Sequence, residues 1–245
     1  MKGKIYVVGT GPGFEEYLSL RAITVLKECD VVVGYRTYIN LIEKLIEGKE
    51  IHSSGMRKEV ERCQQVVDIA LSGKNVCMVS SGDPGVYGMA GIILEMVAQA
   101  NNGIEVEIVP GITSALSSAS LAGAPLMNDF AVISLSDLMT PWEVIETRVD
   151  KASEGDFVMC IYNPKSMTRV EQISIFKNIV ARHRDPQTPV AIVRDAMRTE
   201  EAVTLTTLEE MLTHHIDMTT TLIIGNSQTY VANGKMITPR GYKIG

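Results

Sequence analysis

The sequence predicts an α/β fold made of two domains. Short β-branched runs alternate with helical patterns along the chain, which is typical of a largely parallel sheet covered by helices. At about 150 residues per domain, 245 residues make one large domain or two small ones. The composition changes around residues 110–114, where a run of small residues begins. We therefore expect an N-terminal α/β domain (1–112) with a mainly parallel sheet and a C-terminal α/β domain (113–245) with a mixed sheet.

The first half contains strand and helix patterns in alternation. Ser19 precedes a helical pattern that starts at Leu20, and its hydroxyl is a suitable N-cap. The clearest helix covers 57–71, because its apolar residues recur on one face while Lys58, Glu59 and Arg62 point away. The expected strands are 5–8, 30–33, 50–52, 76–80 and 106–109.

The second half repeats this alternation and closes with a hairpin signal. Asn233-Gly234 lies between apolar residues, which favours a two-residue β-turn. The expected helices are 115–122, 142–151, 170–184 and 207–215. The expected strands are 131–135, 157–162, 190–193, 202–205 and 220–224.

Composition and charge exclude several classes of protein. The chain carries 23 Lys+Arg and 29 Asp+Glu, and 23 − 29 gives a net charge of −6, which argues against a nucleic-acid partner. No apolar run approaches the roughly 20 residues of a membrane span, and the N-terminal apolar run stops at Gly9. The four cysteines lack zinc-site spacing, so we expect no metal site and reduced thiols in a cytoplasmic protein.

A glycine-rich loop, residues 9–13, follows the first expected strand. It differs from the dinucleotide-binding fingerprint, because Phe14 stands where the third glycine belongs and Pro12 has no N–H to offer a phosphate. The helix also starts late, near Leu20, and Asp30 begins the second strand instead of ending it. The loop is therefore either a tight turn or a surface for another ligand.

A second glycine-rich loop, residues 80–88, follows the fourth expected strand. Ligands of open α/β sheets bind beyond the carboxyl ends of the strands, where this loop offers Asp83 and Tyr87. The position before Pro84 favours an extended backbone at Asp83. An ordinary strand-to-helix turn explains the same residues equally well.

Three segments in order, GTGPG (9–13), GDPGVYG (82–88) and VPGITS (109–114), resemble the successive motifs of the tetrapyrrole methylases. These are S-adenosylmethionine-dependent enzymes of cobalamin and sirohaem synthesis, and the resemblance covers essentially the whole chain. Segments 133–138, 140–142, 161–164 and 236–242 are most similar to the branch that methylates C17 of precorrin-3B or cobalt-factor III and contracts the ring.

The resemblance implies a homodimer of two-domain subunits, with a small-molecule tetrapyrrole and the methyl donor S-adenosylmethionine in a cleft between the domains. Cobalt would arrive only within the substrate. The implied donor-binding residues are Pro12, Ser81, Gly82, Asp83, Val86, Thr113, Ser114, Tyr162, Asn163 and Ala196.

Methyl transfer from a sulfonium requires alignment more than a covalent residue, which suits a chain without a nucleophile–base pair near its glycine loops. Asp83 could bind the donor's amino or hydroxyl groups, or could simply bond its own turn. The substrate's acetate and propionate arms require local positive charge, for which we expect Arg57, Lys165 and Arg194, although each alone could be a solvated surface charge.

Ring contraction also needs proton transfers, for which Asp83, Tyr87 and His52 are the candidate catalytic residues. His52 could equally be a satisfied structural histidine. Two alternatives remain open from the sequence: a sister methylase that alkylates another ring carbon, and a non-catalytic tetrapyrrole carrier on the same scaffold. RNA methylation is disfavoured by the acidic charge balance.

Overall fold

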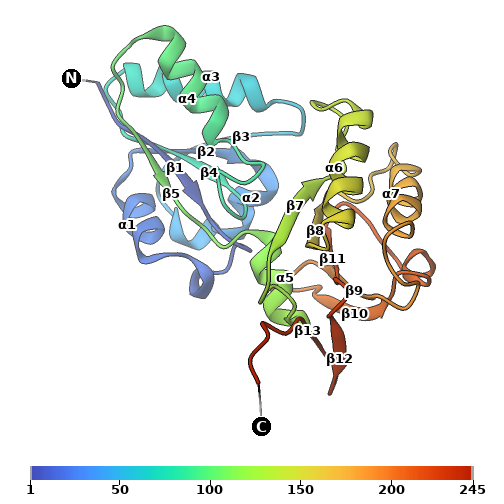
Figure 1. Ribbon diagram of the computed structural model, residues 1–245. Helices are drawn as coiled ribbons and strands as arrows, with labels where there is room; N and C mark the ends of the chain where they lie inside the picture. Colours follow the sequence, from blue (N-terminus) through green and yellow to red (C-terminus); the bar gives the residue numbers. More distant parts are fainter. Residues whose placement is uncertain (1, 244–245) are drawn as a thin grey trace. The chain divides into compact units, whose positions relative to one another are not determined.

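A computed structural model describes residues 2–243 of the chain. The chain forms two compact units, Met1–Thr113 and Ser114–Gly245, which we call unit 1 and unit 2. Each contains a five-stranded sheet covered by helices (Figure 1), so the predicted α/β class is confirmed.

Unit 1 is built on a fully parallel sheet in the order β3-β2-β4-β1-β5. Its central strands are runs of buried, mostly β-branched residues, as expected for a sheet with both faces covered. All five strands lie where the sequence predicts them, with small differences at their ends. They are β1 (Ile5–Gly9), β2 (Val31–Tyr35), β3 (Glu50–Ser54), β4 (Val76–Ser80) and β5 (Val106–Val109).

Four α-helices cover this sheet, two on each face. Val31 and Val33 of β2 contact the core beneath α3 and α4, whereas Val32 contacts the core beneath α1 and α2. This alternation follows from the two-residue repeat of a strand. The helices are α1 (Leu20–Glu28), α2 (Arg36–Leu41), α3 (Glu59–Leu71) and α4 (Ala90–Ala100), with 3-10 turns at Glu15–Tyr17 and Glu43–Leu45.

The predicted start of α1 is confirmed and that of α3 is wrong by two residues. Ser19 Oγ accepts a hydrogen bond from the Ala22 N–H at 3.1 Å, which caps α1. Arg57, expected as the first helical residue, has φ +60° and lies in the loop, so α3 begins only at Glu59.

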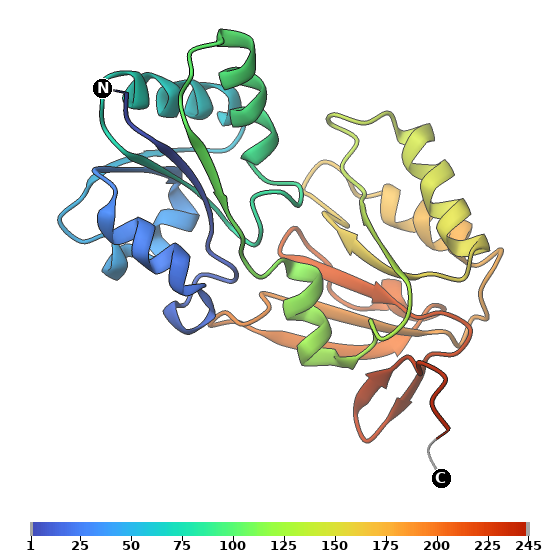
Figure 2. The same ribbon diagram turned by 60° about the vertical axis from the view of Figure 1, so that its left-hand side comes forward.

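Unit 2 contains a mixed sheet in the order β10-β9-β11-β8-β7, in which only β7 and β8 are parallel. Figure 2 shows α5 on one face and α6 and α7 on the other. The strands are β7 (Phe130–Ser134), β8 (Val158–Tyr162), β9 (Pro189–Arg194), β10 (Ala202–Thr207) and β11 (Thr220–Ile224). The helices are α5 (Ser114–Ala122), α6 (Trp142–Glu154) and α7 (Gln172–Val180).

The small residues of α5 let it lie close to the sheet. Ala115, Ala119 and Ala122 are buried against a face that includes Cys160 and Ala191. On the opposite face, α6 and α7 cover a core with larger side chains, among them the fully buried Phe176.

Two helix predictions in unit 2 need correction. The helix expected at 207–215 is absent, because Thr207 still pairs with Pro189 in the β10–β9 ladder and the Leu208 N–H then donates to Thr188 O. Only one 3-10 turn, Met211–Thr213, forms in that segment. The helix expected at 170–184 is shorter and covers Gln172–Val180.

The predicted C-terminal hairpin is confirmed. Asn233 and Gly234 have φ +51° and +69°, as the two-residue type I′ turn requires, and they connect β12 (Tyr230–Ala232) to β13 (Lys235–Ile237). The β13 strand also pairs with β6 (Gly123–Ala124). Within residues 2–243, no helix is both long enough and apolar enough to cross a bilayer.

Candidate ligand site at the carboxyl ends of β1, β4 and β5

Three loops leave the sheet of unit 1 side by side. Strand β1 lies between β4 and β5, and all three are parallel, so the loops that follow them emerge at one edge. These are the first glycine-rich loop after β1, the second after β4, and the 110–113 segment after β5. In open α/β sheets this edge is where ligands bind.

The first two loops are joined through their backbones. The Gly11 N–H donates to Gly82 O at 3.1 Å, and the Gly82 N–H donates back to Gly11 O at 2.9 Å. Both residues have positive φ, +55° and +65°, which glycine adopts without steric cost. The two glycine-rich loops therefore form one rigid edge.

The third loop packs so tightly against the second that glycine is required. A Cβ on Gly111 would lie 2.2 Å from Gly82 O, and a Cβ on Gly9 would lie 2.7 Å from the Gly111 nitrogen. Gly9 of the first loop therefore serves the packing of these loops.

Asp83 connects the second loop to the third. Its Oδ1 accepts the Gly85 N–H at 2.8 Å, and its Oδ2 accepts the Gly111 N–H at 3.1 Å. The carboxylate therefore accepts a hydrogen bond from its own turn, one of the two roles expected for it, and another from the neighbouring loop. Each oxygen retains a further lone pair, so a cationic or N–H-bearing ligand group could still be accepted.

After Asp83 the second loop makes a tight turn. The Val86 N–H donates to Asp83 O at 3.2 Å, and Tyr87 follows with φ +53°, a conformation that costs a bulky residue energy. The Tyr87 side chain is 57% exposed. Pro12 of the first loop is buried.

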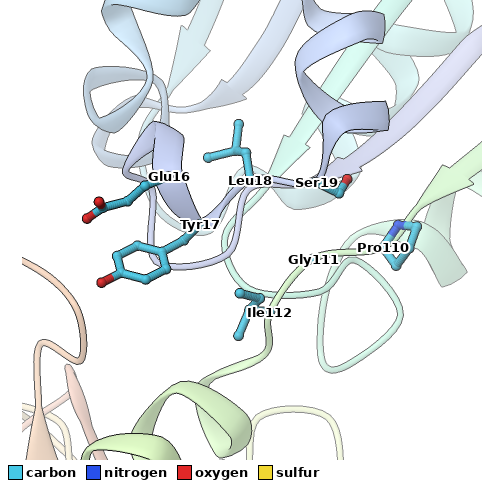
Figure 3. A pocket seen from close by; sticks show the side chains of 7 residues that line it. All are labelled: Glu16, Tyr17, Leu18, Ser19, Pro110, Gly111 and Ile112. Atoms are coloured by element: carbon cyan, nitrogen blue, oxygen red, sulfur yellow. The ribbon is translucent and has the colours of Figure 1, made fainter.

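A pocket of about 260 Å³ lies beside these loops (Figure 3). Leu18, Pro110 and Ile112 give it an apolar lining, and Tyr17 and Glu16 stand at its side. This volume is below the ~300–1,000 Å³ of typical ligand pockets, so it can hold only part of a ligand of the methyl donor's size. Gly111, which Asp83 bonds, also lines this pocket.

Four of the predicted donor-binding residues belong to unit 2, and some of them lie close to one another. The four are Ser114, Tyr162, Asn163 and Ala196. The Tyr162 hydroxyl accepts the Ala115 N–H at 2.6 Å, which links the end of β8 to the start of α5, next to Ser114. Tyr162 and Ala196 pack against the same core cluster.

Asn163, and the two residues that flank Ala196, have a left-handed backbone conformation. Asn163 has φ +50° and its Nδ2 donates to Ser134 Oγ at 3.0 Å. Ala196 lies between Asp195 and Met197, with φ +47° and +56°. Such strain is concentrated at functional sites and persists because surrounding contacts fix it.

The predicted substrate-binding residues have different surroundings. Arg57 is exposed and Lys165 partly buried, and none of the ion pairs within residues 2–243 includes either. Arg194 Nε lies 3.7 Å from Asp195 Oδ2. Arg169, in contrast, is held internally, because its Nη1 donates to Leu135 O and Asn163 O at 2.9 and 2.6 Å, and burial lowers its pKa.

His52 lies in the middle of β3, opposite Val33, two residues before the carboxyl end of the strand. Its Nδ1 is hydrogen-bonded with Gln65 Nε2 at 2.9 Å, and its Nε2 with Glu50 Oε1 at 2.8 Å. Both ring nitrogens are therefore engaged, which is the structural alternative considered from the sequence.

Two residues of this region have no distinguishing pattern in the sequence. Tyr17 and Leu18 line the pocket but follow the first motif without any pattern of their own. Arg169, which the sequence offers beside Lys165 as a basic residue for the substrate's carboxylates, instead fixes two loop carbonyls. Residues 2–243 contain no group of three or more His, Cys, Asp or Glu side chains that could hold a metal ion.

A parallel α/β unit with joined glycine-rich loops at its ligand-binding edge belongs to the class of small-molecule-binding α/β enzymes. Residues 4–212 match the model of the Tetrapyrrole (Corrin/Porphyrin) Methylases. The chain belongs to this family and is a methyltransferase.

The relatives carry more specific names. The chain is 47% identical over 99% of its length to the cobalt-factor III methyltransferase of Priestia megaterium, of which it spans only 46%. It is 46% identical to the probable cobalt-factor III C(17)-methyltransferase of Salmonella typhimurium, over 97% of this chain and 99% of that relative.

Two solved structures of methyltransferases are similar to this chain. The structure of the methyltransferase CobJ covers 97% of this chain and is itself fully covered, with a TM-score of 0.92 and 35% identity. The uroporphyrin-III C-methyl transferase of Thermus thermophilus, complexed with S-adenyl homocysteine, covers 91% of this chain and is 97% covered, with a TM-score of 0.71 and 26% identity.

Proposed function

We propose that this chain transfers a methyl group from S-adenosylmethionine to C17 of cobalt-factor III, with contraction of the macrocycle, in cobalamin biosynthesis. The observation that carries the proposal is the 46% identity to the Salmonella typhimurium relative, which extends over nearly the full length of both chains. Cobalt belongs to the substrate, and the protein itself supplies no metal in this proposal.

We place the methyl donor against the loop edge of unit 1. When bound, S-adenosylmethionine supplies an activated methyl group on a sulfonium. A cationic ligand group is supported there, because each Asp83 carboxyl oxygen accepts one backbone N–H from residues 2–243 and keeps a further lone pair. The proposed donor contacts are Pro12, Ser81, Gly82, Asp83, Val86, Thr113, Ser114, Tyr162, Asn163 and Ala196.

The residues of the chain have positioning roles in this proposal. The joined loops hold the donor in one orientation, which can contribute several kcal/mol to an in-line displacement. Arg57 and Lys165, which follow the ends of β3 and β8, and Arg194, the last residue of β9, meet the carboxylate arms of the macrocycle in this proposal.

Anaerobic incubation with S-adenosylmethionine and cobalt-factor III tests the proposal. We expect the macrocycle to gain one methyl group by mass spectrometry, and the product's NMR spectrum to place it on C17. A methyl group on another carbon would identify a sister methylase, and a spectral change without methyl transfer would identify a carrier. A parallel reaction with precorrin-3B shows whether the enzyme also accepts a macrocycle without cobalt.

We further propose that the protein acts as a homodimer in the cytoplasm. The dimer is supported by the resemblance to the methylase family, and light scattering of the purified protein measures it. The location is supported by the free, buried thiols of Cys29, Cys63, Cys77 and Cys160, which suit a reducing compartment.

A further inference from the structure

Arg62 is a buried charge without a counter-charge. It lies in the first turn of α3 and is 5% exposed, yet none of the ion pairs within 4.0 Å among residues 2–243 includes it. The other buried arginine, Arg184, is 8% exposed and has its Nη1 3.0 Å from Asp156 Oδ1. Burial of an unpaired charge is costly, so the surroundings of Arg62 need an explanation.

Neutral groups hold the Arg62 guanidinium by one edge. Its Nε donates to Ser54 Oγ at 2.9 Å, its Nη2 donates to Gly55 O at 2.8 Å, and its Cζ lies 6.0 Å from the centre of the Tyr35 ring. These contacts use two of the five N–H groups of a guanidinium and leave both N–H groups of Nη1 and one of Nη2. That remaining end has the fork shape that a carboxylate matches with two parallel hydrogen bonds.

Two residues that contact the Arg62 guanidinium lie at the carboxyl edge of the sheet, where ligands of open α/β sheets bind. Tyr35 and Ser54 are partners in register and are the last residues of β2 and β3. Nη1 has no hydrogen-bond partner among residues 2–243, and it is not one of the completely buried polar atoms without a partner, such as Ser118 Oγ and Arg184 Nε.

We propose that Arg62 binds a carboxylate arm of the macrocyclic substrate through this free fork. The inference rests on the proposed function, which supplies a substrate with several carboxylates. A flexible acetate or propionate arm can reach a guanidinium that is almost fully buried. The arm then provides the counter-charge that unit 1 itself does not, and Ser54 and Gly55 keep the fork oriented before it arrives.

Steady-state kinetics of Arg62→Gln and Arg62→Lys test the assignment. Loss of a hydrogen-bonded charge pair should raise KM for cobalt-factor III about ten- to a hundredfold in Arg62→Gln with little change in kcat. Arg62→Lys should recover part of this loss, because it keeps the charge but not the fork. An unchanged KM in a folded Arg62→Gln protein would overturn the proposal.

The donor has a carboxylate of its own, so its binding is measured separately. Calorimetric titration with S-adenosylhomocysteine should give the same Kd for wild type and Arg62→Gln. A weakened Kd with an unchanged KM for cobalt-factor III would show that Arg62 binds the donor's carboxylate, against the proposal. Arg184→Gln is the matched control, since it removes a buried guanidinium from unit 2 and should lower stability without raising KM.

A binding titration separates this inference from the proposed function. Uroporphyrin III, a porphyrin with acetate and propionate arms, is titrated against wild type and Arg62→Lys by absorbance. Weaker binding by the variant supports the carboxylate site even if wild type transfers no methyl group to cobalt-factor III. Equal binding of uroporphyrin III by wild type and variant contradicts it, and thermal unfolding of the variant shows whether it is folded.

Discussion

Asp83 shows how one side chain can connect two loops of the candidate ligand site. It accepts one N–H from its own turn and one from the loop after β5, and so joins two loops that are distant in sequence. A carboxylate is a stronger acceptor of backbone N–H groups than a neutral oxygen. The link between the two loops, which we call the Asp83 clamp, and the proposed donor contact therefore depend on the same two carboxylate oxygens.

We expect Asp83→Asn to weaken donor binding more than it weakens the fold. The amide can accept only one of the two N–H groups, and its NH₂ group faces the other, which costs roughly 1.5–3 kcal/mol. Calorimetry with S-adenosylhomocysteine and urea unfolding measure the two effects. A variant that is less stable but binds the donor with wild-type affinity would restrict Asp83 to the clamp.

His52 is expected to be structural. Since both ring nitrogens are hydrogen-bonded to Glu50 and Gln65, neither is available to move a substrate proton. We predict that His52→Gln lowers the free energy of unfolding by about 1 kcal/mol and leaves kcat within twofold of wild type. A loss of kcat of a hundredfold or more, in a folded protein, would restore His52 as an acid–base candidate.

At the scale of elements, the contact between the β4 and β5 loops leaves no room for a side chain. Gly111→Ala would place a Cβ 2.2 Å from Gly82 O, so one loop must move. We expect a loss of about 1–3 kcal/mol in stability together with weaker donor binding.

Gly91→Ala is the matched control for this prediction. Gly91 lies in α4, and a Cβ there meets nothing within 4 Å. Alanine should stabilise the helix by up to ~1 kcal/mol without affecting donor affinity. Chemical unfolding and calorimetry of both variants show whether losses of stability and donor affinity come from the crowded loop contact or from any added methyl group.

The edge strand β5 pairs with β1, and ion pairs of Glu107 add to this attachment. Glu107 lies 2.7 Å from Arg21 Nε and 2.9 Å from Lys4 Nζ, and hydrogen bonds from Arg21 and Lys4 lower the pKa of Glu107 to about 2. A carboxyl whose folded pKa is lowered stabilises the fold above its unfolded pKa of about 4.3, and this contribution is lost as the pH falls towards 2.

Glu107→Gln should therefore be less stable than wild type at pH 7, by roughly 0.5–1 kcal/mol for a partly exposed pair. The difference should shrink between pH 4.5 and 2. Urea unfolding across this range measures it, and Glu47→Gln, which removes an exposed carboxylate that is in none of the ion pairs among residues 2–243, serves as the control. A difference that is constant with pH would exclude the ion pairs as its cause.

At the scale of the whole molecule, the sequence predicts the sheets well because buried strands have a strong local pattern. All ten strands expected from the sequence are present. The false helix at 207–215 arises because pairing of Thr207 with Pro189 overrides the helical periodicity, and no local pattern reports such pairing. For the same reason the sequence singles out Asp83 and the segment 109–114 but not the hydrogen bond from the Gly111 N–H to Asp83. It also gives no reason to distinguish Arg62 from an exposed charge.

The proposed donor contacts are distributed over both units, and hydrogen exchange can test them without assuming how the units are arranged. Amides of 81–86 and 111–113 should exchange more slowly when S-adenosylhomocysteine is bound, because the ligand restricts opening of the loops. If the contacts assigned from family resemblance hold, the segments 162–163 and 195–197 should also be protected, although they belong to unit 2. The hairpin at 230–237, which carries no proposed contact, should be unchanged. Protection limited to unit 1 would remove Tyr162, Asn163 and Ala196 from the site.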